Sequence, residues 1–197
     1  MRCGDCWVSA PETHSDSASV TERESKQRLF FALWPDGEVR ESMDNLARQH
    51  ARHNGHAVVP ENLHITLAFV GGVSVEQRVC MEAAAATIVA PPAFTVTFDR
   101  LGFWPRPRIL WVGASVMPPE LSDLVTALNS ALIPCGYQPE TRPFQAHVTL
   151  ARKAQRPPEI VTIPPIVWPV DAFCLVESVT GERGSEYRVI GRWPLRV

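Results

Sequence analysis

The sequence lacks an excess of charge of either sign, and it lacks long apolar runs. Its 19 basic and 21 acidic side chains leave a formal net charge of −2, so nothing in it favours a protein that coats DNA. No apolar stretch reaches the roughly 20 residues of a membrane-spanning helix, and the N-terminus lacks the apolar core of a secretory signal. We therefore expect a cytoplasmic protein that does not contact membranes.

Cysteine is scarce, and its odd count of five, spread along the chain, argues against a fold held together by disulfides. Cys3 and Cys6 form a C-x-x-C pair, which could be half of a metal site or a redox pair. No second pair follows it in the sequence, and no strand–helix pattern surrounds it. We interpret the pair as an inert motif in a tail.

Motifs that bind phosphates or metals are also missing. The sequence contains neither G-x-x-x-x-G-K-[ST] nor H-E-x-x-H, and it has no array of acidic residues for two metal ions. We expect no cofactor and no metal. The rival candidate for a metal site is the cluster of His50, His53 and His56, but this cluster has no carboxylate or cysteine partner at ligand spacing. A solvated surface is the better interpretation of that cluster.

The distribution of apolar residues predicts one domain after a tail. Residues 1–26 are rich in Ser, Thr, Asp and Glu without apolar periodicity, and we expect a disordered extension there. The remaining residues, 27–197, are enough for a single bilobal domain with one good core. The composition, 45% hydrophobic and 20% charged, is ordinary for a globular protein.

The same order of elements occurs twice in that domain. A strand, a helix, a loop and a strand that carries a histidine are predicted over 28–70, and again over 108–151. The histidine strands read ENLHITLAFVGG (61–72) and FQAHVTLARK (144–153). An internal duplication explains this order, so we predict two similar α/β lobes that each contribute one such strand.

The segments around these two rounds are also informative. Ser74 to Gln77, SVEQ, is a capping-box pattern that opens an Ala-rich helix to about residue 90. Residues 157–169 are interpreted as a Pro-rich connection. Strands are expected over 170–178 and in EYRVIGRW near the C-terminus.

Each histidine strand carries a threonine two positions after the histidine. Residues i and i+2 of a strand share a face, so His64 projects with Thr66, and His147 with Thr149. One imidazole can accept a proton from a nucleophile while the other gives one to a leaving group. Threonine hydroxyls can donate to the oxygens of a phosphoryl transition state. A lone histidine here would be a satisfied core residue, but a matched pair favours a cleft with acid–base chemistry.

These residues resemble the 2H phosphoesterase superfamily, whose signature is two H-x-[ST]-h motifs, where h is apolar. Within it, the chain resembles the bacterial RNA 2′,3′-cyclic phosphodiesterases of the LigT type, also described as 2′-5′ RNA ligases. The likeness covers about residues 28–197 and includes RLFFALWPD, GFWPRPRILWVG and the closing LVES…EYRVIGRWPL.

The resemblance implies an α+β fold that is bilobal, with two pseudo-symmetric lobes, antiparallel sheets lining a central cleft and helices outside. It implies hydrolysis of RNA 2′,3′-cyclic phosphate ends to 2′-phosphates, with reversible 2′-5′ ligation as a further possibility. By motif position, His64 matches the proton donor and His147 the proton acceptor, while Thr66 and Thr149 match the phosphate-binding hydroxyls.

The position three residues after the second motif's threonine often carries a basic residue in this family, and here it is Arg152. The first motif has Phe69 at the equivalent place, so we expect a basic side chain to assist phosphate binding from the side of the second motif only. Arg152 could equally be a solvated strand end.

The expected partners are RNA ends or small cyclic-phosphate nucleotides, bound by a monomer. Two alternatives remain open. One is a phosphodiesterase for another cyclic or 2′-5′ nucleotide. A comparison of the turnover of short RNA ends with that of small cyclic nucleotides would distinguish this enzyme from one that acts on RNA ends. The other is a non-catalytic module that binds RNA ends, which the intact His–Thr pairs in both lobes argue against.

Overall fold

The computed structural model describes residues 26–51, 54–181 and 184–196. The expected disordered tail, its Cys3 and Cys6, and His53 of the rival cluster lie outside these ranges, so the boundary between tail and domain stays a prediction. Within the described ranges, no helix has the length and apolar character needed to cross a bilayer.

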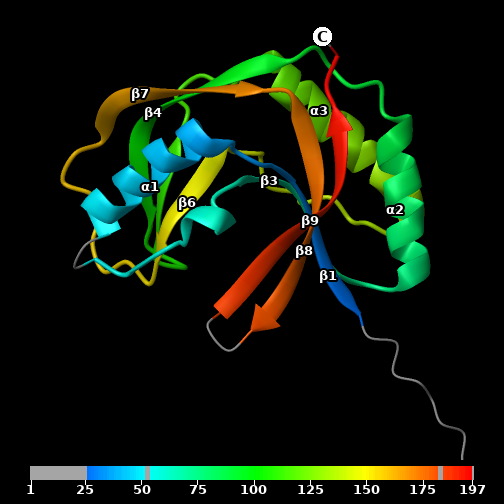
Figure 1. Cartoon of the computed structure of the whole chain (residues 1–197), viewed down its shortest axis with the longest axis horizontal. Coiled ribbons are helices and arrows are strands. Elements are labelled where there is room, and N and C mark those ends of the chain that lie inside the picture. Colours follow the sequence, from blue (N-terminus) through cyan, green and yellow to red (C-terminus); the bar gives the residue numbers. More distant parts are fainter. Residues whose placement is uncertain (1–25, 52–53, 182–183, 197) are drawn as a thin grey trace, which may run out of the picture.

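Two antiparallel sheets and three main helices make up the described chain (Figure 1). The helices are α1 (Gly37–Ala51), α2 (Val75–Thr87) and α3 (Pro119–Leu132), with short 3-10 turns η1 (Pro60–Asn62) and η2 (Ile133–Cys135). The strands are β1 (Gln27–Leu33), β2 (His56–Ala57), β3 (Ile65–Val73), β4 (Phe94–Trp104), β5 (Ile109–Gly113), β6 (His147–Arg152), β7 (Thr162–Val170), β8 (Ala172–Gly181) and β9 (Gly184–Pro194).

The sheets follow the predicted repeat. One sheet has the order β3-β1-β8-β9 and the other the order β2-β6-β5-β4-β7. In each round the first strand pairs directly with the histidine strand, β1 with β3 and β5 with β6, both antiparallel. The predicted α+β class with two antiparallel sheets is therefore confirmed.

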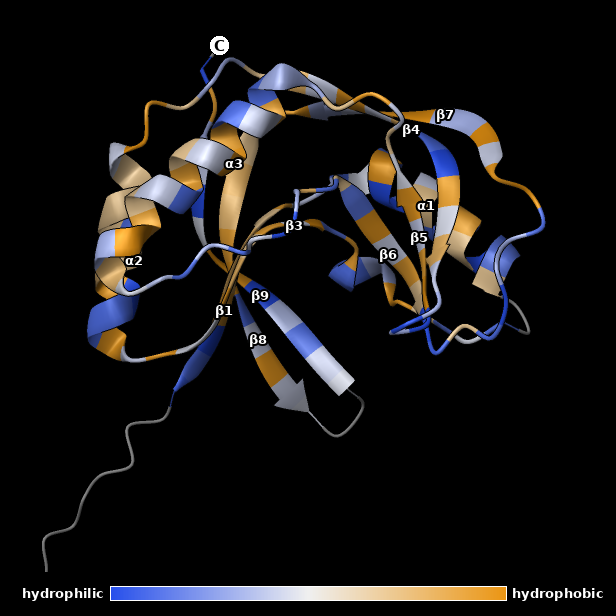
Figure 2. Ribbon diagram, turned by 180° about the vertical axis from the view of Figure 1, so that it is seen from behind, coloured by the Kyte–Doolittle hydropathy of each residue, from blue (hydrophilic) through white to orange (hydrophobic). Residues whose placement is uncertain are grey.

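The helices are exchanged between the sheets, which the sequence did not predict. Helix α1 follows β1, yet it packs on β6 and β7 of the other sheet. Helix α3 follows β5, yet it packs on β3, and α2 lies against α3 and β9. Figures 1 and 2 show α1 beside β6 and the α2–α3 pair on the opposite side of the molecule. Each sheet is thus packed against a helix that follows a strand of the other sheet.

The interpretation of 157–169 as a Pro-rich connection was wrong, because β7 occupies most of it. Among the described residues, this strand pairs with β4 alone, at the edge of the five-stranded sheet. Proline has no N–H to donate to a ladder, so it is tolerated on an edge strand, and β7 carries Pro164, Pro165 and Pro169. Ile163 and Trp168 of the same strand are buried in the core.

Helix α2 begins with the predicted capping box. The backbone N–H of Gln77 donates to Ser74 Oγ over 3.3 Å, and the Ser74 N–H donates to Gln77 Oε1 over 3.1 Å. The helix ends at Thr87, three residues before the expected end, and the Thr87 hydroxyl donates to the Ala84 carbonyl over 2.8 Å. Each of these contacts satisfies a backbone group that a helix end leaves free.

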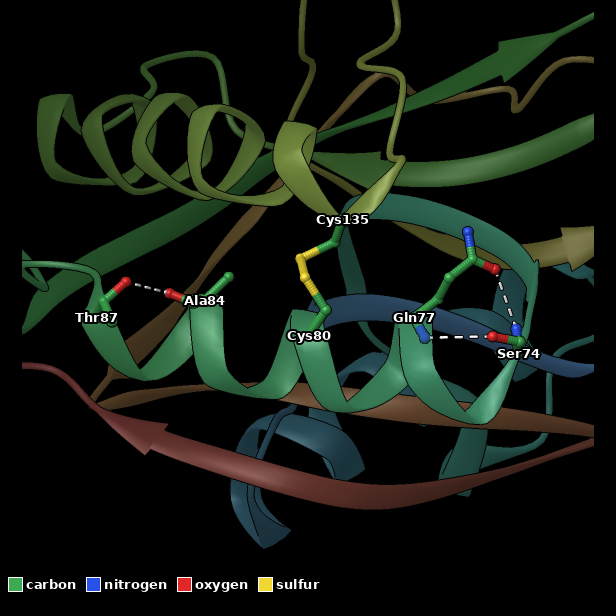
Figure 3. The surroundings of a disulfide bond; sticks show 6 residues. All are labelled: Ser74, Gln77, Cys80, Ala84, Thr87 and Cys135. Atoms are coloured by element: carbon green, nitrogen blue, oxygen red, sulfur yellow. Dashed lines mark hydrogen bonds between the residues drawn. A yellow bond between two sulfur atoms is a disulfide. The ribbon is translucent and has the colours of Figure 1, made fainter.

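A disulfide joins Cys80 of α2 to Cys135 of η2 (Figure 3). These cysteines are 55 residues apart, and nothing in their local sequence predicted the pairing. The bridge links α2 to the end of α3 on the outside of the four-stranded sheet. Among the described residues, the remaining cysteine is Cys174, a buried thiol in β8.

Strand β1 is covered on both faces. Leu29, Phe31 and Leu33 face the main core, under the helices. On the other face, Phe30 and Ala32 pack in a second, smaller cluster with Cys174, Val176, Trp34 and Tyr187. This double cover explains the continuous apolar run from 29 to 34, and it brings aromatic rings to the side of the sheet that carries His64.

Removal of the disulfide is expected to lower the free energy of unfolding by about 2–4 kcal/mol, because the bridge limits the freedom of the unfolded chain. Urea denaturation of the Cys80→Ser, Cys135→Ser double variant measures this loss. Reductant should destabilise the unmodified protein by a similar amount and leave the double variant unchanged. Equal urea midpoints for the oxidised and reduced protein would contradict the expectation.

Candidate active site

At both motifs, successive side chains alternate between the two faces of the strand, as predicted. Ile65 and Val148 are fully buried in the core, so the residues on either side of them point to the opposite face. Strands β3 and β6 belong to different sheets but contact each other. The His–Thr pair of one sheet therefore lies close to the His–Thr pair of the other.

Two adjoining cavities meet at these motifs, and they share Thr66 and Phe69 in their linings. The first cavity has a volume of about 660 Å³, and His64, Thr149 and Arg152 line it. The second cavity has a volume of about 640 Å³, and His147 lines it. Thr66 lines both. The structure thus brings all five predicted site residues together, with the two imidazoles in different cavities.

Both imidazoles are fixed by the same backbone contact. His64 Nδ1 lies 2.6 Å from the Asn62 carbonyl oxygen, and His147 Nδ1 lies 2.8 Å from that of Gln145. A carbonyl can only accept, so Nδ1 carries the proton in each ring and Nε2 is left for chemistry. In His64, Nε2 lies 3.0 Å from Thr66 Oγ1, and the neutral ring accepts a hydrogen bond from that hydroxyl.

Three aromatic rings enclose His64. Trp34 is stacked on it with a centroid distance of 5.5 Å, Phe30 lies at 4.9 Å, and Tyr187 presents its edge at 5.4 Å. Burial lowers the pKa of His64 to about 4, against the Asn62 hydrogen bond, and the charges of Arg152 and His147 lower it further. At neutral pH this imidazole is therefore uncharged in the free protein.

The ring of His147 has a simpler setting. Trp104 lies edge-on to it with a centroid distance of 4.6 Å, and Trp111 lies 5.4 Å from Trp104. Burial lowers the pKa of His147, opposed by the hydrogen bond to the Gln145 carbonyl. A neutral ring with a free Nε2 suits a general base. The aromatic stack needs Gly102, because a Cβ there would collide with the Trp111 indole.

The first cavity is lined by a second arginine, which the expectation drawn from Phe69 did not include. Arg28 of β1 lies over the Phe69 ring, with its guanidinium carbon 5.9 Å from the ring centroid, and it lines the same cavity as Arg152. Arg28 was not among the predicted site residues, since it stands at the start of the apolar segment RLFFALW, which is typical of a strand buried in a core. The available signal was its spacing of two from Phe30, which places both on one face.

His56 of the rival cluster, which was interpreted as solvated surface, also lines a cavity. His56 is exposed, pairs with Arg152 between β2 and β6, and lines the first cavity. His50 of the same rival cluster is part-buried on α1 and lines neither cavity. In the part of the chain that is described, no group of three or more His, Cys, Asp or Glu could hold a metal ion.

Comparison with known proteins identifies relatives over most of the chain. Residues 33–111 match the model of a family described as LigT like Phosphoesterase. The RNA 2′,3′-cyclic phosphodiesterase of Escherichia coli (strain K12) is 37% identical over 174 residues, which cover 86% of this chain and 97% of that protein. The same enzyme name is carried by an Archaeoglobus fulgidus protein that is 32% identical over 69% of this chain and 78% of its own.

A solved structure agrees with the sequence comparison. Escherichia coli LigT in its apo form superposes with a TM-score of 0.78 at 36% identity, covering 88% of this chain and 99% of that one. The similarity therefore extends over both sheets and both cavities rather than over one motif.

The pKa of His64 is expected near 4 in the free protein and higher once an anion occupies the first cavity, because a nearby negative charge favours the imidazolium. NMR titration of the ring protons, without and with inorganic phosphate, measures both values. Trp34→Ala should admit water and raise the pKa of the free protein toward its ordinary value. An ordinary histidine pKa in the unmodified protein, unchanged by phosphate, would show that the aromatic enclosure does not act as described.

Proposed function

Because the chain belongs to the LigT-like phosphoesterase family, we propose that it hydrolyses the 2′,3′-cyclic phosphate ends of RNA and leaves 2′-phosphates. The observation that carries this is the placement of the two imidazoles in adjoining cavities that share Thr66, His64 in the first and His147 in the second. Displacement at phosphorus needs the attacking and leaving oxygens roughly in line, hence a base and an acid on opposite sides.

The proposed reaction uses only side chains of this protein. His147 Nε2 accepts a proton from water, whose oxygen attacks the phosphorus. The bond from phosphorus to the 3′-oxygen breaks, and His64 Nε2 gives its proton to that oxygen. The phosphate stays on the 2′-oxygen. No step requires a metal or a cofactor.

His64 must carry a second proton before it can act as the acid, and substrate binding supplies the driving force. The cyclic phosphate is an anion, and an anion beside a buried imidazole raises its pKa. The stacked face of Trp34 also favours the cation. Once Nε2 is protonated it can no longer accept from Thr66, so the Thr66 hydroxyl is free to turn toward the phosphate.

The remaining predicted residues bind the charge that develops on the phosphate. Thr66 and Thr149 donate hydroxyl hydrogen bonds to the non-bridging oxygens. Arg152 and Arg28, both in the first cavity, neutralise the anion and fit its oxygens as guanidinium groups do.

We further propose that the protein acts as a monomer in the cytoplasm, because one chain supplies both imidazoles and both hydroxyls. Disulfides are rare in a reducing cytosol. In that compartment we expect Cys80 and Cys135 to be thiols lying side by side.

The two histidines are expected to act as one unit. His64→Ala and His147→Ala should each lower kcat about 10²–10⁴-fold, the usual worth of a positioned acid or base. The double variant should lose far less than the product of the two single losses, since groups that act together are not additive. Hydrolysis of an oligonucleotide with a 2′,3′-cyclic phosphate end, with small cyclic nucleotides assayed in parallel, provides the measurement.

His50→Ala is the matched control, because His50 lies outside both cavities, and it should keep the full rate. Excess EDTA should also leave the rate unchanged. A near-normal rate for either active-site variant in folded protein, or formation of 3′-phosphate product only, would overturn the assignment.

The pH dependence should differ between kcat/KM and kcat. The kcat/KM profile reports the free enzyme, in which both histidine pKa values are lowered from the ordinary value of about 6.5, so its optimum should lie on the acid side of pH 6.5. The bound phosphate raises the pKa of His64, so the alkaline limb of kcat should lie at higher pH. Initial rates from pH 4 to pH 9 test this, and coincident alkaline limbs would argue against substrate-assisted protonation.

A further inference from the structure

Three segments that are far apart in the sequence meet at one end of the five-stranded sheet. They are the β4–β5 turn (105–108), the chain that follows β6 (153–156) and the chain that precedes β2 (54–55). The backbone N–H of Ala154 donates to the carbonyl of Arg108 over 2.9 Å, which joins the first two segments. Figure 2 shows that the loops at this end of β5 and β6 are largely hydrophilic.

The side chain of Asn54 ties the third segment to the chain after β6. This side chain is buried, with 4% of the residue exposed. Its Oδ1 accepts from the N–H groups of Gln155 and Arg156 over 2.9 and 3.2 Å, and its Nδ2 donates to the Arg156 carbonyl over 3.0 Å. Gly55 has a φ of 100°, and a Cβ there would collide with the carbonyl oxygen of Arg152. The backbone that follows Arg152 is therefore held in place by buried polar contacts.

This end of the sheet carries an excess of positive charge, and we call it the basic rim. Five exposed cations define the rim, namely Arg106, Arg108, Arg152, Lys153 and Arg156. Segments 104–109 and 152–158 contain no acidic residue, and Glu159 is the first one after them, although the whole chain has a net charge of −2. In the described part of the chain none of the five cations forms a salt bridge, whereas four other arginines do.

Two of these cations have a backbone conformation that is unusual for their residue type. Arg108 and Lys153 have φ angles of 66° and 56°, and no other non-glycine residue of the described ranges has a positive φ. The Cβ atom makes this left-handed region unfavourable, so glycine or asparagine is expected at such positions. Unfavourable backbone conformations are concentrated at binding and catalytic sites. The presence of Arg and Lys therefore favours a role for their charge.

The basic rim is continuous with the first cavity through Arg152. Arg152 belongs to both, and its cross-strand partner His56 lines the same cavity. Cross-strand partners project to the same face of a sheet, so the two side chains are neighbours. Thr149, which is proposed to bind the reacting phosphate, precedes Arg152 by three residues, or roughly 10 Å along the strand. A chain that extends from the reacting phosphate past Arg152 therefore reaches the rim.

We propose that the basic rim binds the sugar–phosphate backbone of the substrate RNA upstream of its cyclic end. The proposal rests on the proposed function, which places the 3′-terminal nucleotide in the first cavity beside His64. Every nucleotide before the terminal one adds a phosphate, and arginine and lysine side chains bind phosphates without reading the bases. The enzyme should therefore select RNA chains over mononucleotides by charge and accept many sequences.

Binding to the rim can be measured without turnover. A short RNA oligonucleotide with a 2′-phosphate end, the product of the proposed reaction, is titrated against the protein at several salt concentrations. The triple variant Arg108→Asn, Lys153→Asn, Arg156→Gln removes three charges, and asparagine suits the two left-handed positions. Each phosphate contact to a single strand adds about 0.7 to the slope of log Kd against log salt, so this slope should fall by roughly 2 in the variant.

A 2′-mononucleotide and a second variant provide the controls. The mononucleotide has no further phosphate to place on the rim, so its Kd and its salt slope should be the same in the triple variant and the unmodified protein. Arg192→Gln removes an arginine of β9, in the other sheet, which lines neither cavity and pairs with Asp171 over 2.9 Å. This variant should leave the salt slopes of both ligands unchanged.

Hydrolysis rates test the selection between substrates. For an oligonucleotide with a 2′,3′-cyclic phosphate end, the triple variant should lower kcat/KM about tenfold through a higher KM, the usual worth of a hydrogen bond to a charged group. For a 2′,3′-cyclic mononucleotide, kcat/KM should stay the same, because the catalytic groups are untouched.

Two outcomes would overturn the proposal. If the triple variant keeps the salt slope of the oligonucleotide, the rim does not bind RNA and is a surface for another partner. If oligonucleotide and mononucleotide lose equally, the three side chains act on the catalytic groups instead of on the RNA chain. If the unmodified protein hydrolyses neither substrate, the proposed function fails, while the change in salt slope still decides whether the rim binds RNA.

Discussion

The contact between β3 and β6 is the constraint on which the rest of the structure depends. These strands lie in different sheets and contact each other, and each has one face buried in the core. Burial of Ile65 and Val148 fixes the register, because a slip of one residue would turn every side chain to the wrong face. Hydrophobic packing on one side of each strand thus positions the acid–base groups on the other.

The duplicated motif supplies two chemically equal imidazoles, and the surroundings make them unequal. His64 is enclosed by three aromatic rings, whereas His147 has a single ring at its edge. The stronger desolvation acts on the group proposed as the acid, and it lowers the pKa of His64 to about 4 in the free protein. The aromatic rings that keep His64 uncharged in the free protein would also shield its second proton from water after the imidazole is protonated.

Local patterns made much of the fold and the site predictable. The H-x-T pairs gave the face on which His64 and His147 lie, and the capping box at Ser74 gave the start of α2. What remained hidden depended on distant partners. Arg28 stands at the start of an apolar run, and although its spacing from Phe30 indicates its face, its place over Phe69 follows from the pairing of β1 with β3.

The other missed features have the same cause. The pairing of Cys80 with Cys135 depends on how α2 meets α3, and neither sequence segment contains that information. The prolines of β7 argue against a strand until its edge position is known. Helix exchange is invisible to periodicity, because an amphipathic stripe shows that a helix is covered on one face, not which sheet covers it.

The exchange of helices between the two sheets has a consequence for how the protein unfolds. If α1 were pulled away, it would expose β6 and β7, which belong to the sheet of the other round, and loss of α3 would expose β3. When one round of elements unfolds, the sheet of the other round loses the helix that covers it. The two sheets should therefore unfold in one cooperative transition. An ancestral single round would have had no partner for its own helix, unless a second copy of the same chain supplied the missing cover.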